Sequence, residues 1–176
     1  MGKSYLLKPY VESAQDLKLE SSIDFKNGLL CLDYTLSSNV TISKVLLPSF
    51  EKAERQNGLW KSSCFEAFLF FTEPDYIEIN ISPSGAWNCY SFSSYRQGMV
   101  MTEDLNMTHL SSSHSDNEFH LEACFNYSLK KYPNSVQLCA ILENSNTKQL
   151  SYWALEHSPK EPDFHLKRLS TNYRWS

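Results

Sequence analysis

Hydrophobic and polar residues alternate with a period of two along most of the chain, a pattern typical of β-strands with one buried face. The alternation is clean over residues 77–82, where Glu78, Asn80 and Ser82 share one face and isoleucines occupy the other. Comparable runs predict further strands over 29–36, 64–71, 87–92, 119–126, 136–142 and 150–155. Turn signals, including Asn27-Gly28, separate these runs. The pattern predicts a single all-β domain over residues 1–176, an antiparallel β-sandwich or jelly roll.

Three segments lead to more specific expectations. Residues 50–55 are the one helix-like stretch, and the polar run 110–118 (LSSSHSDNE) is predicted to be a mobile loop. In the strand that follows, the period of two places one set of residues in the core and the other set outside. The inward set is Phe119, Leu121, Ala123 and Phe125, and the outward set includes His120 and Glu122.

Composition and charge exclude several classes of protein. Hydrophobic residues at 41% and charged residues at 20% are ordinary for a globular domain. A net charge of −4, with no basic run, argues against nucleic acid or an anionic membrane as partner. The N-terminus resembles no secretion signal, and no apolar stretch is long enough to span a bilayer. We therefore expect a cytoplasmic protein.

The cysteines agree with a reducing compartment. Five are present, an odd number, and none forms a Cys-x-x-Cys pair. They lie in strand-like runs, so we expect five buried free thiols and no disulfide. Cys64 has apolar neighbours that would not activate it, and a structural role is favoured over a nucleophilic one.

The sequence contains few signs of catalysis or metal binding. The chain contains no GxSxG, HExxH, GxGxxG or phosphate-loop sequence. His114, Asp116, Glu118 and His120 alternate and would share one face of an extended chain, where they could hold a divalent metal. A solvated loop running into a strand explains the same residues better, because the spacing alone carries no ligand geometry.

The richer chemistry lies between residues 59 and 96. Glu66 is the only charge in an apolar strand, and a buried carboxylate needs a partner, for which Arg96 or a sugar hydroxyl are candidates. Trp60 immediately precedes this strand. The alternative is that Trp60 and Trp87 anchor the core and that Glu66 is a satisfied structural acid.

A second candidate segment, SYWALEHSPKEPDFH, lies near the C-terminus. It places Trp153 in a strand, followed by a loop that ends in Asp163, Phe164 and His165. Prolines on both sides of Lys-Glu fix the entry and exit of this loop, and so pre-organise the residues it presents.

Three stretches, GLWKSSCFEAFL, YIEINISPSGAWNCYSFSSYRQGM and LSYWALEHSPKEPDFH, resemble in order the signature of DOMON-like domains related to family 9 carbohydrate-binding modules, in a cytosolic bacterial subgroup. The resemblance implies a β-sandwich that binds sugar or haem. It implies that Trp60 and Glu66 open the site strand and that Asn80 follows as a polar site residue. Trp153, Phe164 and Trp87 are candidates for a second sandwiching aromatic. The chain lacks the calcium-ligand run of the secreted modules.

The expected function is therefore non-enzymatic binding of a small carbohydrate or sugar-containing ligand. The expected site comprises Trp60, Glu66, Asn80, Trp87, Arg96, Trp153, Phe164 and His165. In this site Asn80 lies nearest the aromatics, whereas Glu78 meets solvent or a neighbouring strand.

Three alternatives remain at this stage. A haem domain would need axial ligands, for which His165 with Met99 or Met101 is the attractive pair. A glycoside hydrolase would act through Glu66 with Glu78 or Asp163. In a structural or interaction module, all the aromatics would serve the core. No cofactor is expected, with haem or calcium as the exceptions to test.

Overall fold

The computed structural model describes residues 3–11, 16–72 and 74–173, and this part of the chain contains no α-helix. Its strands are β1 (Lys3–Pro9), β2 (Leu17–Lys26), β3 (Leu29–Ser38), β4 (Glu54–Arg55), β5 (Cys64–Phe70), β6 (Tyr76–Ile81), β7 (Ala86–Phe92), β8 (Val100–Met101), β9 (Leu105–His114), β10 (Glu118–Tyr127), β11 (Ser135–Glu143), β12 (Leu150–Ala154) and β13 (Thr171–Asn172). Two 3-10 turns, η1 (Leu59–Lys61) and η2 (Lys167–Leu169), complete the elements.

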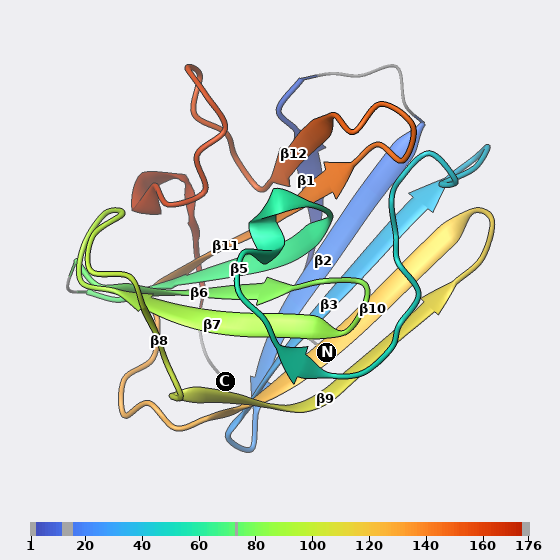
Figure 1. Ribbon diagram of the computed structural model, residues 1–176. Coiled ribbons are helices and arrows are strands. Elements are labelled where there is room, and N and C mark those ends of the chain that lie inside the picture. The colour runs from blue at the N-terminus through green and yellow to red at the C-terminus, as the bar shows by residue number, and fades with distance from the viewer. Residues whose placement is uncertain (1–2, 12–15, 73, 174–176) are drawn as a thin grey trace.

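The strands form two layers that are joined through β1. The first layer has the order β1-β2-β3-β10-β9, and the second has β4-β7-β6-β5-β11-β12-β1. Residues 3–7 of β1 pair with β2, whereas Lys8 and Pro9 pair with β12, so this strand passes from one layer to the other. In Figure 1 the strands β5–β7 cross in front of the diagonal strands β2 and β3, and β10 and β9 continue the same layer toward the lower right. Apart from the short parallel pair β4–β7, the ladders are antiparallel, which confirms the predicted β-sandwich class.

All seven predicted strands are present, with ends shifted by one or two residues. Asn27 and Gly28 both adopt positive φ, 54° and 78°, between β2 and β3. Two consecutive positive φ angles characterise the type I′ hairpin turn that this dipeptide predicts.

The main core lies between the two layers and confirms the inside–outside assignment of β10. Phe119, Leu121, Ala123 and Phe125 are all buried in it. His120 lies on the outer face, where its Nε2 is 2.6 Å from Asp33 Oδ2. A period of two with one apolar set suffices to fix which face of the strand is buried.

Two local predictions were wrong. Residues 50–55 are not helical: residues 50–53 have no regular secondary structure, and the segment ends in β4, which lies beside β7. Most of residues 110–118 are not a loop, because β9 continues to His114 and pairs along β10; residues 115–117 alone form the connection between the two strands. β9 is an edge strand, and the solvated side chains of an edge give it a polar composition despite its regular pairing.

The prediction of five free thiols was also wrong. Cys31 and Cys124 form a disulfide between β3 and β10, and only Cys64, Cys89 and Cys139 remain free. The two bonded cysteines lie directly opposite each other in the register, with their Cα atoms 4.1 Å apart. Their pairing depends on this cross-strand alignment, which no spacing in the sequence reveals. The disulfide removes the cysteine argument for a reducing compartment.

A second, smaller hydrophobic cluster lies on the outer face of the second layer. It contains Phe68 and Phe70 of β5, Tyr76 of β6 and Phe92 of β7, and Phe164 packs onto it from the C-terminal segment. The segments that cover this face are η1, the loop 93–99 and residues 155–169. They leave part of it open, and this opening is the candidate site.

Candidate functional site

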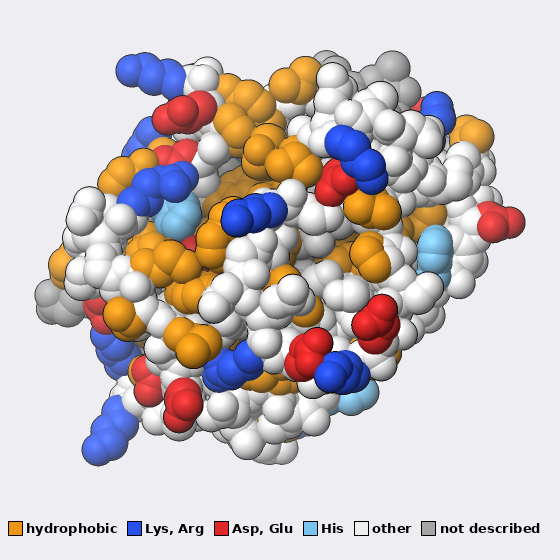
Figure 2. All heavy atoms as spheres, in the orientation of Figure 1, with side chains coloured by type: hydrophobic (Ala, Val, Ile, Leu, Met, Phe, Trp, Pro, Cys, Tyr) orange, Lys and Arg blue, Asp and Glu red, His pale blue; other side chains and the backbone are white. Residues whose placement is uncertain are grey.

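A cleft of about 330 Å³ opens between these covering segments. Its floor comes from β5, β6 and β11, and its walls come from η1, the loop 93–99, β12 and the C-terminal segment. It is lined by Trp60, Glu66, Glu78, Phe92, Arg96, Met99, Ile141, Tyr152, Pro162, Phe164 and His165. In the space-filling view of Figure 2, hydrophobic side chains gather around a hollow on this face of the molecule.

Two carboxyl groups lie at the floor of the cleft. Glu66 and Glu78 are only 2% and 5% exposed, although both reach the cleft. Burial raises the pKa of Glu66 well above its usual value, and the neighbouring Glu78 raises it further. Burial also raises the pKa of Glu78, to about 7, against the opposing effects of a hydrogen bond from Asn80 and the charge of Arg96. Desolvation disfavours the charged carboxylate, so this floor holds acids that retain protons near neutral pH.

The two acids differ in how well they are hydrogen-bonded. Asn80 Nδ2 donates to Glu78 Oε1 at 2.6 Å and holds that carboxyl in place. Glu66 Oε1 has no hydrogen-bond partner within the described residues. An unsatisfied buried acceptor is costly, but this oxygen has almost no accessible surface, so a ligand that donates to it must shift the Glu66 side chain as it binds.

His165 faces Glu78 from the C-terminal segment, with Nε2 3.9 Å from Glu78 Oε2. Burial lowers the pKa of His165 to about 4, and the charge of Arg96 contributes, so the imidazole is neutral at pH 7. Its Nδ1 is 2.7 Å from the Tyr76 hydroxyl, which also accepts a hydrogen bond from the Arg96 amide at 3.1 Å. If the Tyr76 hydroxyl donates its own hydrogen to Nδ1, the ring proton of His165 lies on Nε2, toward Glu78.

Arg96 and Asp163 join two walls of the cleft. Arg96 Nη2 donates to Asp163 Oδ1 at 3.0 Å, and the Tyr95 hydroxyl donates to Asp163 Oδ2 at 2.5 Å. Although partial burial raises the pKa of Asp163, the hydrogen bonds from Tyr95 and Arg96 outweigh it and lower the pKa overall. Arg96 also adopts a left-handed φ of 54°, which is strained for a residue with a side chain. The loop 93–99 is thus tied to the C-terminal segment by an ion pair.

Aromatic rings form the sides of the cleft. Trp60, held by η1, packs edge-on against Tyr90 with ring centroids 5.8 Å apart. Phe164 packs against Phe68 at 6.4 Å and against Tyr152 at 6.1 Å. Gly58 precedes η1 with a φ of 77°, a left-handed conformation suited to glycine, and so directs the chain toward Trp60.

The structure brings five of the eight predicted site residues to the cleft: Trp60, Glu66, Arg96, Phe164 and His165. Asn80 is fully buried behind Glu78 and reaches the cleft only through that side chain.

Trp87 and Trp153 are not at the cleft, because both belong to the core between the layers. Trp87 packs edge-on against Phe125 at 5.7 Å, and the Arg55 guanidinium lies 4.3 Å from its ring centroid. Trp153 Nε1 donates to Ser151 Oγ at 3.1 Å. The core interpretation of Trp87 was therefore the right one.

Two expectations about the acids were wrong. Arg96 is not the partner of Glu66, because it binds Asp163 instead. Glu78 does not meet solvent: it is buried at the floor beside Asn80. The alternation in β6 correctly placed Glu78 and Asn80 on one face. Whether that face is covered depends on segments that are distant in the sequence.

Sequence reasoning also missed Tyr152 as a wall of the cleft. The available signal was the alternation in β12, which puts Tyr152 on the face opposite Trp153. Met99 lines the cleft as well, whereas Met101 is exposed in β8.

In the described ranges no cluster of His, Cys, Asp or Glu could hold a metal ion, so His114, Asp116, Glu118 and His120 do not form one. Within the same part of the chain, no helix has the length and apolar character needed to cross a membrane.

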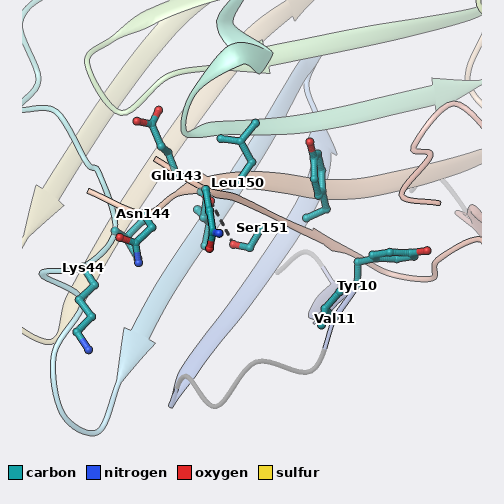
Figure 3. Close-up of a pocket in the computed structure, with 11 residues that line it drawn as sticks. Tyr10, Val11, Lys44, Glu143, Asn144, Leu150 and Ser151 are labelled. Atoms are coloured by element: carbon teal, nitrogen blue, oxygen red, sulfur yellow. Dashed lines mark hydrogen bonds between the residues drawn. The ribbon is translucent and has the colours of Figure 1, made fainter. Parts of the chain in front are cut away.

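A second, smaller cleft of about 230 Å³ lies across Tyr152, between the end of β11, the start of β12 and the segment around Lys44. Figure 3 shows Lys44, Glu143 and Asn144 on one side and Tyr10 on the other. Between them Ser151 Oγ donates to Leu142 O at 3.2 Å. Glu143 is already bound by Ser62 Oγ at 2.6 Å. Its acidic group is satisfied, unlike Glu66.

The fold and the cleft together define a β-sandwich with an aromatic-walled, acid-floored cleft on one outer face. By sequence, no protein-family model and no curated protein matches the chain. By structure, it is similar to a Bacteroides uniformis ATCC 8492 protein provisionally described as carbohydrate-binding, with a TM-score of 0.61, 11% identity, and 96% of this chain and 84% of that one covered.

It is also similar to a family 9 carbohydrate-binding module from Caldicellulosiruptor kristjanssonii. The complex of that module with cellotriose gives a TM-score of 0.53 at 7% identity, with 96% of this chain and 77% of that one covered. The complex with glucose gives a TM-score of 0.50 at 7% identity, with 96% and 78% covered. At such identities the likeness establishes the fold.

Proposed function

We propose that the cleft between η1, the loop 93–99 and the C-terminal segment binds a small carbohydrate, and that the protein is a non-enzymatic, DOMON-like relative of family 9 carbohydrate-binding modules. The observation that carries the proposal is the combination of aromatic walls with a buried, unsatisfied carboxyl oxygen on Glu66. The structural neighbours support it, since they are carbohydrate-binding proteins by description.

The chemistry of a sugar matches this arrangement. A pyranose has an apolar C–H face that packs on a flat aromatic ring and hydroxyl groups that need directed polar partners. Trp60 and Phe164 would take the apolar face. Glu66 and Glu78 would accept hydrogen bonds from hydroxyls, and His165 would complete the polar set.

Calorimetric titration with mono- and disaccharides tests the proposal. Trp60→Ala should cost about 2 kcal/mol or more of binding free energy, because a central aromatic anchor is lost. Glu66→Gln should cost about 1–3 kcal/mol, because the shape is kept but a carboxyl oxygen that can accept from a sugar hydroxyl is replaced by an amide group. Phe50→Ala is the matched control: Phe50 is 40% exposed and does not line the cleft, so binding should not change.

Thermal melts separate this role from that of a plain interaction module. If the two residues serve a ligand, neither variant should unfold, and a bound sugar should raise the melting temperature of the wild type. Destabilised variants together with a wild type that no sugar stabilises would show that the aromatics serve only the fold. Release of nitrophenol from nitrophenyl glycosides, lost in Glu66→Gln, would instead show a hydrolase.

Haem binding is the second candidate, because His165 and Met99 both line the same cleft. The carbohydrate is favoured over haem since His165 Nδ1 already bonds Tyr76 and two carboxyl groups would face the apolar macrocycle. Reconstitution with haem followed by an absorbance spectrum decides: a Soret band that disappears in His165→Ala would establish haem. A cytoplasmic location belongs to the same proposal. It is supported if Cys31 and Cys124 remain reduced thiols in the cell, and it fails if their disulfide forms there.

A further inference from the structure

Among the described residues, the two acidic groups on the floor of the cleft form no ion pair with Lys or Arg, although the charge of Arg96 acts on Glu78 and partly opposes the rise in its pKa. Glu66 and Glu78 come from adjacent strands, and both reach the cleft while almost fully buried. Glu66 Oε1 is unpartnered among the described residues. Two neighbouring acids in a dry site repel each other when both are charged.

The basic side chains that line the cleft, Arg96 and His165, do not act as directly bonded, charged partners of the two acids. The guanidinium of Arg96 is bound to Asp163 at 3.0 Å, and this pair is roughly neutral as a unit. Its side chain is half exposed, which screens its effect on the floor. His165 faces Glu78 as a neutral imidazole, since burial lowers its pKa to about 4.

The aromatic walls above the two acids suit a cation as well as they suit the apolar face of a sugar. Trp60, Phe92, Tyr152 and Phe164 surround the opening, and aromatic faces attract organic cations held close to them. A group placed between these rings and the two carboxyls would therefore gain from both if it carried positive charge. A neutral hydroxyl would gain less from either.

We infer that the ligand of this cleft carries an ammonium group, which binds between Glu66 and Glu78 while the rest of the molecule packs on Trp60, and that the ligand is an amino sugar of the 2-amino-2-deoxyhexose class. The inference rests on the proposed carbohydrate function and narrows it. The raised pKa values of both acids agree with it, because an unmatched pair of buried acids holds protons that an ammonium ion would displace.

Calorimetric titration with glucosamine, N-acetylglucosamine and glucose at pH 6.5 is the test, because these sugars differ at position 2 in charge and substituent. Glucosamine should bind about tenfold or more tightly than the two neutral sugars, the gain expected from a charge-assisted contact. Its binding should release protons, which is visible as a dependence of the measured heat on the buffer. Glu66→Gln and Glu78→Gln should each weaken glucosamine about tenfold more than they weaken glucose.

Glu118→Gln removes an exposed acid on the first layer and is the matched control, for which no change is expected. Cyclohexylamine serves as a cation without a sugar. If glucose binds and glucosamine binds no more tightly, the ammonium inference fails and the carbohydrate function stands. If cyclohexylamine binds as tightly as glucosamine and glucose does not bind, cation recognition stands and the carbohydrate function fails. If none of the probes binds, both fail.

Discussion

Replacing Glu78 by Gln should stabilise the protein at alkaline pH and leave its stability almost unchanged in acid. Glu78 is only 5% exposed, and folding raises its pKa from 4.5 to about 7, chiefly by desolvation. Gln has nearly the same shape, and its carbonyl oxygen can still accept the hydrogen bond that Asn80 Nδ2 donates to Glu78 Oε1. The substitution therefore removes the charge and little else.

The sign and size follow from the linkage between proton binding and folding. Below pH 4.5 Glu78 is protonated in both states and costs nothing. As pH rises from about 4.5 through about 7, the unfolded chain loses the proton first, so folding is progressively penalised. The rise from 4.5 to about 7 corresponds to a penalty on the order of 3 kcal/mol above pH 8, and most of it is relieved by pH 5. For a chain of this size, that equals roughly 6–12 °C in melting temperature.

Thermal melts of the wild type and Glu78→Gln between pH 5 and pH 8.5 measure this difference. The variant should melt higher than the wild type at pH 8 and within about 2 °C of it at pH 5. His165, whose lowered pKa destabilises the fold as pH falls from about 6.5 to about 4, is present in both proteins and cancels in the comparison. Glu118→Gln should follow the wild type at every pH. A gap between Glu78→Gln and the wild type that is absent at pH 8, or that widens toward acid, would refute the desolvation argument.

Two further predictions concern the core and the cysteines. Phe125→Ala should lower the free energy of unfolding by about 3–5 kcal/mol, because it empties a fully buried site against Trp87, whereas His120→Ala on the outer face should cost under about 1 kcal/mol. Urea unfolding of both variants measures this difference, and equal costs would contradict the register of β10. Thiol titration of the denatured protein should find three free thiols before reduction and five after it, and five thiols without reduction would disprove the disulfide. Joint replacement of Cys31 and Cys124 by Ser should lower the free energy of unfolding by about 2–4 kcal/mol.

The amino-acid sequence by itself determined the class of fold, the strands and the inward face of each strand with a clean period of two. The reason is local: side chains of an extended chain alternate between faces, so the apolar set of β10 or β6 identifies the buried side without reference to any other segment. The Asn27-Gly28 turn was readable for the same reason, because its positive φ angles follow from the two residues themselves. Trp60 and Glu66 were also correctly brought to one place, since η1 leads directly into β5.

Only the tertiary structure decided which outer face is covered and which side chains meet there. Glu78 becomes buried because the loop 93–99 and the C-terminal segment lie over β6, and Arg96 binds Asp163, 67 residues away, rather than Glu66. Trp87 and Trp153 look equivalent to Trp60 in the sequence, but the layers place them in the core. The Cys31–Cys124 disulfide likewise depends on the register of β3 against β10. Each of these outcomes is a contact between distant segments, and pairing of that kind is fixed by packing of the whole chain rather than by any local pattern.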